Sequence, residues 1–303
     1  MKRFVSVGEC MVELAPSSEA GLYAMAFSGD TFNTAWYARG VLPADWTVDY
    51  VTAVGCDGVS GRMLDFARDS GIGTGHVARI EGRTLGLYLI ELKEGERSFV
   101  YWREQSAARL LAEDPARLAA AFSGADVVYF SGITLAVIGA EGRSNLLSEV
   151  RRARAAGALA VFDPNLRPRL WPDTEAMCAA VMEAAAVCDI ALPSFDDEAQ
   201  HFGDADPEAT ASRYAGAGAS MVAVKNGGGA VLVRGRLGDS LFEPDPVAEV
   251  VDTTAAGDSF NAGFLAAHLD RAPDRAAAEA GAKLAGKVIG GRGALVRAAR
   301  DGT

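Results

Sequence analysis

The stretch 252-DTTAAGDSFNAGFLAAHLD-270 is the part of the sequence that bears most directly on the fold. A polar turn of small residues runs here straight into a long helical pattern. Small side chains allow the backbone N–H groups of residues 255–258 to approach an anion closely, and a helix starting at this point adds the partial positive charge of its N-terminus. The turn therefore predicts an anion-binding loop, with Asp258 beside the bound group.

A second interpretation of the same residues needs no ligand. Thr253 or Thr254 could cap the helix, and Asp258 could simply favour the helix dipole. In the first interpretation Asp258 would instead accept the proton of a hydroxyl that attacks the bound group. The motif alone fits both, so the rest of the chain has to decide between them.

Short β-branched runs alternate with longer Ala-rich helical patterns over most of the chain. The strand candidates are almost continuously apolar, as strands covered on both faces must be: 3–7, 50–54, 126–130, 159–162, 189–192, 221–225 and 230–233. Helices are predicted within 252–270 and at 59–70, 114–122, 140–156, 174–187, 207–217 and 273–290. This alternation predicts an α/β fold of three layers, with helices on both faces of a mainly parallel sheet.

Two stretches break this alternation. Residues 9–32 look like extended segments joined by a Pro- and Ser-containing turn, and residues 84–103 look like a β-hairpin with arms at 86–92 and 97–102 and KEGE as its turn. Neither stretch has a helix to cover its second face. We therefore expect a small sheet that projects over one edge of the main sheet, where it could act as a lid.

Charge and composition exclude several classes of protein. Lys plus Arg is 29 and Asp plus Glu is 40, so the net charge is −11 and neither nucleic acid nor a membrane is expected as a partner. No apolar run reaches the ~20 residues that a membrane-spanning helix needs. The cysteines form no CxxC pair, which favours reduced thiols and a cytoplasmic location, and the three histidines have no zinc-site spacing.

The motif DTTAAGDSFNAGF is similar to the C-terminal signature of the PfkB (ribokinase-like) carbohydrate kinases, D-T-[TV]-G-A-G-D-x-F, with Ala255 where glycine is commoner. The resemblance extends over nearly the whole chain, and the DTTAAGDSF form resembles the 2-keto-3-deoxygluconate (KDG) kinase branch. It implies one ribokinase-like domain over 1–303, with lid segments at about 9–32 and 84–103. It also implies ATP and Mg²⁺ as cofactors and Asp258 as the base, with charge stabilised by Ala255, Ala256, Gly257 and Arg167.

The segment SGDTFNTA at 28–35 resembles the sugar-binding segment of the family. The resemblance implies that Gly29, Asp30 and Asn33 bind the substrate, although by itself the segment would be a turn with a helix cap. Tyr88 and Tyr101 on the hairpin could be ordinary cross-strand packing. Arg103, which shares a face with Tyr101, suits bidentate capture of a carboxylate, and YWR resembles the KDG kinase form of this strand.

The segment DPNLRPRLW at 163–171 follows a predicted strand, at the end where open α/β sheets bind ligands. Without a ligand it would be a surface loop stiffened by prolines. The segment matches the family pattern D-x-N-x-R-x-x-L-W. By that resemblance Asn165 and Arg167 contact ATP, and Arg169 is a second candidate for the sugar acid.

Three further sets of residues are assigned through the resemblance. Lys225, Gly227 and Gly228 would contact ATP, although alone they would be only a hairpin turn. Either Asp197 or Glu198 would organise Mg²⁺, commonly through water, and an acidic helix start at Ser194 explains these residues equally well. Asp252 and Thr254 match positions where relatives bind a monovalent cation such as K⁺.

Together these features predict an ATP-dependent kinase of a sugar acid, with KDG as the leading substrate. One alternative is a kinase of another acceptor, of the fructose, ribose or nucleoside type. Another is a non-catalytic sugar-binding protein on the same fold, since fold alone does not fix function. Family analogy also suggests a homo-oligomer formed through the lid.

Overall fold

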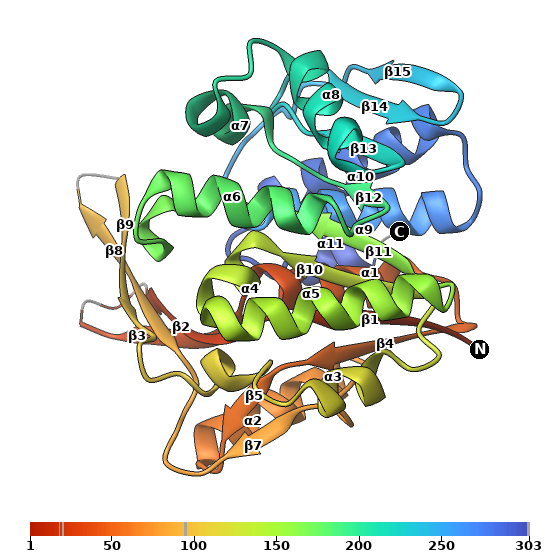
Figure 1. Ribbon diagram of the computed structural model, residues 1–303. Coiled ribbons are helices and arrows are strands. Elements are labelled where there is room, and N and C mark those ends of the chain that lie inside the picture. Colours follow the sequence, from red (N-terminus) through yellow and green to blue (C-terminus); the bar gives the residue numbers. More distant parts are fainter. Residues whose placement is uncertain (18, 20, 94–95, 302–303) are drawn as a thin grey trace.

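In the computed structural model, which describes residues 1–17, 19, 21–93 and 96–301, a nine-stranded sheet forms the centre of the molecule (Figure 1). Its strands in spatial order are β15 (Gly238–Phe242), β14 (Val231–Gly235), β13 (Met221–Val224), β12 (Ile190–Ala191), β11 (Leu159–Asp163), β10 (Val127–Ser131), β1 (Lys2–Val7), β4 (Trp46–Val51) and β6 (Ile72–Gly73). Every pairing from β6 to β13 is parallel, and β14 and β15 are added antiparallel. The predicted mainly parallel sheet is confirmed.

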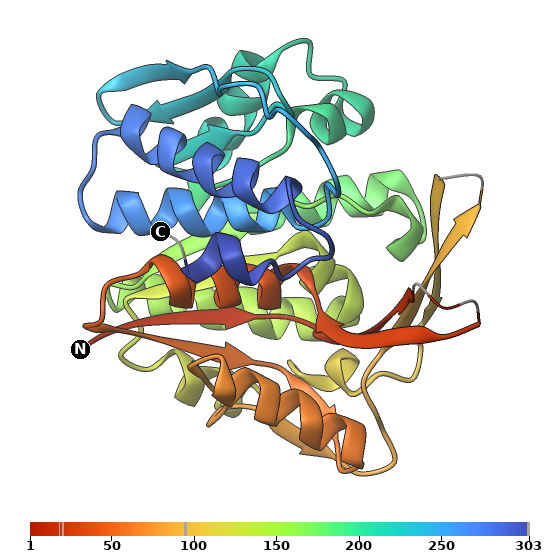
Figure 2. The same cartoon turned by 180° about the vertical axis from the view of Figure 1, so that it is seen from behind.

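Helices cover both faces of this sheet, because successive side chains of each strand enter opposite cores. In β10, Val128 and Phe130 belong to one core and Val127 and Tyr129 to the other. The first core lies under α3 (Pro115–Phe122), α4 (Gly132–Val137), α5 (Gly139–Ala155), α6 (Thr174–Ala185) and α8 (Pro207–Ala217). The second lies under α1 (Asp30–Val41), α2 (Gly58–Asp69), α9 (Ala256–Leu269), α10 (Asp274–Ile289) and α11 (Arg297–Asp301), seen from behind in Figure 2.

A smaller sheet projects from one side of the molecule in both views (Figures 1 and 2). It consists of β3 (Tyr23–Ser28), β2 (Met11–Pro16), β8 (Leu87–Lys93) and β9 (Glu96–Trp102), in that order. The two predicted hairpin arms are confirmed as β8 and β9, which pair antiparallel. Two residues of the predicted KEGE turn, 94 and 95, lie outside the described residues.

Some elements differ from the sequence prediction. The last residues of the 9–32 segment are not extended, because α1 begins at Asp30. This helix gave no amphipathic pattern, since residues 31–38 are all buried. The predicted strand 50–54 is divided at Thr52 into β4 and β5 (Ala53–Gly55), and β5 pairs with β7 (Ala78–Ile80) in a separate two-stranded sheet.

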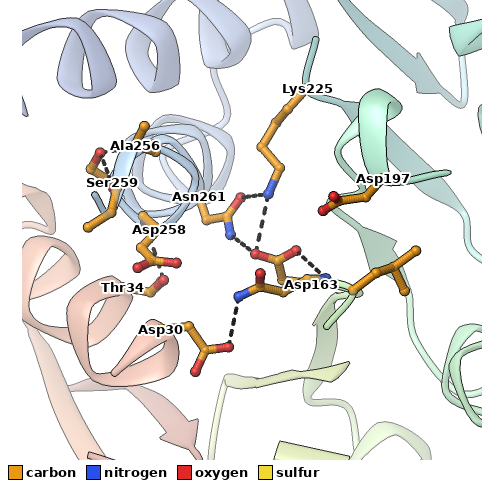
Figure 3. A network of polar contacts seen from close by, with 12 residues as sticks. Asp30, Thr34, Asp163, Asp197, Lys225, Ala256, Asp258, Ser259 and Asn261 are labelled. Carbon is orange, nitrogen blue, oxygen red and sulfur yellow. Dashed lines mark hydrogen bonds and ion pairs between the residues drawn. The ribbon is translucent and has the colours of Figure 1, made fainter. Parts of the chain in front are cut away.

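The carboxyl ends of the parallel strands gather the polar segments at one edge of the sheet. Asp163 ends β11, Ser194 follows β12 and leads into α7 (Phe195–Phe202), and Lys225 follows β13. Ser194 and Lys225 form an isolated bridge that ties the last two segments together. The N-terminus of α9 arrives at the same edge, so residues about 100 positions apart become neighbours (Figure 3).

Candidate active site

The N-terminus of α9 is built by backbone geometry and not by a side-chain cap. Ala255 occupies the cap position with φ 60° and ψ 17°, in the left-handed region, and no side chain caps the helix. Thr254 instead turns its hydroxyl to Asp252 Oδ1, at 2.7 Å. The capping interpretation of Thr253 and Thr254 is therefore wrong.

The loop leaves backbone donors directed out of the helix start. The amides of Gly257 and Asp258 lie in the first turn, where no carbonyl of the preceding turn is available to accept from them. The amide of Ala256 donates to the carbonyl of Thr253 at 3.2 Å, so it is partly engaged. This arrangement can receive an anion at the positive end of a 14-residue helix.

Asp258 is a buried carboxyl group at the edge of this loop. Its Oδ2 accepts a hydrogen bond of 2.8 Å from Asn33 Nδ2, and its backbone carbonyl accepts one from Thr34 Oγ1 at 3.2 Å. Burial, followed by repulsion from Asp30, raises the pKa of Asp258 to about 7, although the Asn33 hydrogen bond opposes this. A carboxyl group with such a pKa can exchange a proton near neutral pH, as a general base requires.

A closed polar network lies beside Asp258 (Figure 3). Lys225 Nζ contacts Asp163 Oδ2 at 3.3 Å and Asn261 Oδ1 at 3.1 Å. Asn261 Nδ2 in turn donates to Asp163 Oδ2 at 2.6 Å. On the other side, Asn165 Nδ2 donates to Asp30 Oδ2 at 3.0 Å, which joins the loop after β11 to α1.

Two cavities meet at this point. The first, of about 430 Å³, lies between the small sheet and the α9 N-terminus, and the second, of about 530 Å³, lies between the loop after β13 and α10. Both are lined by Ser194, Asp197, Lys225, Thr253, Ala256 and Gly257. A ligand in each cavity would therefore have one end at the same helix N-terminus.

The structure brings most of the candidate residues to these cavities. The first cavity is lined by Gly29, Asp30, Asn33, Tyr88, Tyr101, Asn165, Arg167, Ala255 and Asp258, besides the shared residues. The second is lined by Gly227 and Gly228 and closes on an apolar end made by Val247, Val250, Phe260, Ala282, Ala285 and Ile289. A flat apolar group at that end could reach the shared helix N-terminus through a polar tail.

Gly29 lies between β3 and α1, close to the backbone of Glu9. A Cβ at this position would be 2.1 Å from the carbonyl oxygen of Glu9, so no larger residue fits without movement. The amide of Gly29 donates to Asn33 Oδ1 at 3.3 Å, which orients the amide that also holds Asp258. The hydroxyl of Ser28 also donates to Asn33 Oδ1, at 3.3 Å.

Arg103 is not one of the described residues that line the first cavity. Its Nη2 is paired with Glu9 Oε2 in a contact where both side chains are almost completely buried. Glu9 Oε1 and Arg103 Nε have no hydrogen-bond partner. The guanidinium therefore has an unused donor at the base of the small sheet, beside Tyr101, whose ring centre is 5.9 Å away.

Two other candidates, Arg169 and Glu198, are not among the residues that line the cavities. Arg169 is exposed in the 3₁₀ turn Pro168–Leu170 and is not among the residues that line either cavity. Glu198 is buried against α8, where Arg213 and Tyr214 hold its two oxygens at 2.7 and 2.9 Å. Its neighbour Asp197 faces both cavities and lies 3.7 Å from Arg167.

Asp252 braces the anion loop. Its Oδ1 accepts from the amide and the hydroxyl of Thr254, and its Oδ2 accepts from the amide of Gly293 at 2.8 Å. Both carboxylate oxygens thus accept hydrogen bonds from backbone amides.

Sequence reasoning missed several residues of the site. Asp163 is the first residue of the DPNLRPRLW segment, but the family resemblance gives it no role. Asn261 lies one helical turn after Asp258, and the resemblance gives it no role either. Met11 and Phe99 line the first cavity from the small sheet. The spacing of Asn261 from Asp258 could have indicated a shared helix face, since residues three apart are neighbours on a helix.

An open α/β sheet with two cavities that meet at a helix N-terminus, beside the buried carboxyl group of Asp258, has the geometry of a phosphotransferase. Residues 1–298 match the family model described as pfkB family carbohydrate kinase. The chain is 40% identical to a 2-dehydro-3-deoxygluconokinase of Escherichia coli (strain K12) and 39% identical to one of Dickeya dadantii (strain 3937), with 97% of both chains covered in each comparison.

A crystal structure of a PfkB protein from Polaromonas sp. JS666 superposes with a TM-score of 0.83 at 26% identity, covering 98% of both chains. The protein belongs to the pfkB family of carbohydrate kinases. No helix among the described residues is long and apolar enough to cross a bilayer.

Proposed function

We propose that the protein transfers the γ-phosphoryl group of ATP to the 6-hydroxyl of 2-dehydro-3-deoxygluconate (KDG), giving 2-keto-3-deoxy-6-phosphogluconate. The observation that carries this proposal is the position of Asp258, a buried carboxyl group in the first turn of α9 where the two cavities meet. The identity to relatives named 2-dehydro-3-deoxygluconokinase over nearly the full length supports the choice of substrate.

In this proposal each reacting group has a place among the residues of the site. The sugar hydroxyl lies in the first cavity, and its oxygen forms a bond to the γ-phosphorus while the bond from that phosphorus to the bridging oxygen breaks and ADP leaves with the electron pair. Asp258 takes the hydroxyl proton. The amides of Ala255 and Gly257, together with Arg167, stabilise the negative charge of the transferring group, and the partly engaged amide of Ala256 adds to them.

The residues present fit a magnesium ion that is held mainly by ATP phosphates and water. Asp197 faces both cavities and offers carboxylate oxygens, the ligand type that Mg²⁺ prefers, whereas Glu198 is committed to Arg213 and Tyr214. When bound, Mg²⁺ would offset phosphate charge. We therefore choose Asp197 over Glu198 as the residue that organises the metal.

The acid end of KDG would lie under the small sheet, which we propose acts as a lid on a single kinase domain over 1–303. Tyr88 and Tyr101 line the first cavity there, and Arg103 could offer its unused Nε donor to the carboxylate after a small movement. Gly29, Asp30 and Asn33 would hold the middle of the chain. Arg169 would not contact the substrate in this arrangement.

One observation favours a neutral sugar as acceptor instead. Arg103 is already paired with Glu9, so the cavity as it stands has less positive charge than a sugar acid would use. A fructokinase of Vibrio alginolyticus, 28% identical over 86% of this chain, is a relative with such a name. The choice between the two acceptors is open to a direct test.

The test is a coupled ATP-consumption assay across a panel of sugars and sugar acids, with wild-type protein and Asp258→Asn. Turnover with KDG that exceeds turnover with gluconate, fructose and ribose supports the proposal. Turnover with fructose alone would replace the substrate, and no turnover by wild-type protein with any acceptor would indicate a non-catalytic sugar-binding protein.

Three finer points belong to the same proposal. K⁺ would activate through the loop that Asp252 and Thr254 brace, tested by replacing K⁺ with tetramethylammonium. A homo-oligomer would bury the exposed aromatic face of the lid, including Trp102, tested by light scattering. We also propose a cytoplasmic location, which the use of ATP and the four unpaired cysteines support.

A further inference from the structure

The ammonium group of Lys225 occupies the junction of the two cavities. It lines both of them, and a Cβ placed on Gly257 would lie 3.6 Å from its Nζ. The residue is buried, and its backbone is fixed on both sides, with its amide donating to the carbonyl of Pro193 and its carbonyl accepting from Phe195. The Lys225 ammonium is therefore a buried positive charge at the junction of the two cavities.

Two side chains to which the sequence motifs give no role hold the Lys225 ammonium in this position. Asp163 and Asn261 each accept from Lys225 Nζ, at 3.3 and 3.1 Å, and the amide of Asn261 closes the triangle by donating to Asp163. The same Asn261 amide is within 3.0 Å of Tyr129 Oη, and the backbone amide of Asn165 donates to Asp163 Oδ1. Each member of the triangle, which is drawn in Figure 3, thus has a further hydrogen bond to a residue outside the triangle.

We propose that Asp163 and Asn261 are positioning residues that hold the Lys225 ammonium at the cavity junction, so that Lys225 contacts the phosphoryl group while it moves from ATP to the sugar. This inference rests on the proposed kinase function and assigns Lys225 a catalytic role beyond ATP binding. Among the described residues that line the two cavities, the cationic side chains are Lys225 and Arg167, and the Arg167 side chain is half exposed.

The charge balance of the site supports a fixed ammonium. The first cavity has four carboxyl groups, from Asp30, Asp163, Asp197 and Asp258, and it must admit a phosphoryl group that is itself negative. A mobile lysine could be drawn to any of these carboxylates. Two hydrogen-bond acceptors on different elements, β11 and α9, restrict Nζ to one place and leave its third proton for the phosphoryl oxygen.

The network also connects Lys225 to the proposed base. The charged groups that face Asp258 are Asp30 from α1, Asp163 from β11 and Lys225 from the end of β13, with Asp197 and Arg167 in the same cavity. Asp163 raises the pKa of Asp258 and Lys225 lowers it. Removal of the Asp163 charge should therefore move the acidic limb of the pH–rate profile to lower pH, whereas a purely structural residue would leave it in place.

The decisive experiment is a double-mutant cycle with Asp163→Asn and Lys225→Met, measured on kcat and on the Kd of MgATP by calorimetry. We expect Lys225→Met to lower kcat about 100-fold and Asp163→Asn to lower it roughly tenfold, with no rise in the KM for ATP because a negative charge has been removed. In the Lys225→Met background, Asp163→Asn should have almost no further effect on kcat. Asn261→Ala should lower kcat in the same way, and it serves as the test if Asp163→Asn does not fold.

Asp189→Asn is the matched control. Asp189 is also an ion-paired aspartate, bonded to Arg154 at 2.8 Å, but it lies immediately before the central strand β12 and away from both cavities. It should leave kcat and the pH profile unchanged. Additive effects of Asp163→Asn and Lys225→Met on both kcat and the MgATP Kd would overturn the inference. Because the calorimetric cycle needs no sugar, it tests the coupling between Asp163 and Lys225 separately from the identity of the acceptor, so a failure of the proposed KDG activity and a failure of this inference can be told apart.

Discussion

The helix corner, formed by Asp163, Lys225, Gly257, Asp258 and Asn261, and the small sheet are built in opposite ways. In the corner, the polar side chains are buried and each is fixed by bonds to neighbours from other elements. The small sheet exposes aromatic side chains on both faces of β9, with Phe99 and Tyr101 on one face and Trp102 on the other, and they are 40 to 57% accessible. The proposed chemistry is thus placed on buried, fixed groups, whereas the proposed recognition of the acceptor is placed on a sheet with exposed aromatic side chains.

The strongest way to break this comparison is to remove the base from the corner. Asp258→Asn should lower kcat about 1,000-fold or more, because the hydroxyl loses its proton acceptor while the anion loop stays intact. A coupled kinase assay measures this, with calorimetry as the check that MgATP still binds. A variant that retains more than a tenth of wild-type kcat would remove Asp258 from its proposed role.

A change in the small sheet should affect binding of the acceptor and not the chemical step. Arg103→Ala should raise the KM for KDG about 10- to 100-fold with kcat little changed, because a charge-assisted hydrogen bond to the carboxylate is lost. The variant should be made together with Glu9→Gln, since Arg103→Ala alone leaves a buried carboxylate unpaired. The KM for fructose, which has no carboxylate, is the internal control, and an equal rise for both sugars would contradict the prediction.

The pH dependence of the kinase activity should come from Asp258 in the helix corner. With the pKa of Asp258 raised to about 7, kcat/KM should fall close to tenfold per pH unit well below pH 7, as the carboxylate becomes protonated.

The raised pKa of Asp258 also affects stability. The folded state holds this proton more tightly than the unfolded chain, so the free energy of unfolding decreases as the pH rises from about 4 to about 7. Asp258→Asn should therefore be more stable than wild type at pH 8 and should differ less at pH 5, measured by urea unfolding.

The junction between the two regions is sterically tight at Gly29. Gly29→Ala should destabilise the protein by about 1 to 3 kcal/mol, because its Cβ would meet the carbonyl oxygen of Glu9. Urea unfolding measures the loss. Gly58→Ala is the control, since a Cβ there meets no atom within 4 Å and the residue lies in the first turn of a helix, where alanine is favourable.

The smallest effect is expected at the start of α9. Ala255→Gly should stabilise the protein by about 0.5 to 1 kcal/mol, because Ala255 has the left-handed backbone conformation that glycine adopts without strain. Ala256→Gly, one residue later and inside the helix, should have the opposite sign. Equal signs for the two variants would mean that the loop is not strained at Ala255.

Much of the architecture could be predicted from the sequence. Continuous apolar strands and amphipathic helices predicted the layered α/β fold, the hairpin arms and most helix positions, because these features depend on local patterns of burial. The turn of small residues likewise indicated an anion loop ahead of α9. A helix that is buried on all sides has no amphipathic pattern from which it could be predicted. The clearest case is α1, which is buried along most of its length.

By itself the sequence determined which chemical groups are available at the ends of the strands: the Asp258 carboxyl group, the Lys225 ammonium and the arginines of the 163–171 segment. Only the tertiary structure decided which of them meet. It joined Lys225 to Asp163 and Asn261, paired Arg103 with Glu9, and turned Asp197 toward the cavities and Glu198 away from them. The reason is physical: residue types fix donors, acceptors and charges, whereas contacts between residues 15 to 94 positions apart depend on how separate strands and helices are packed.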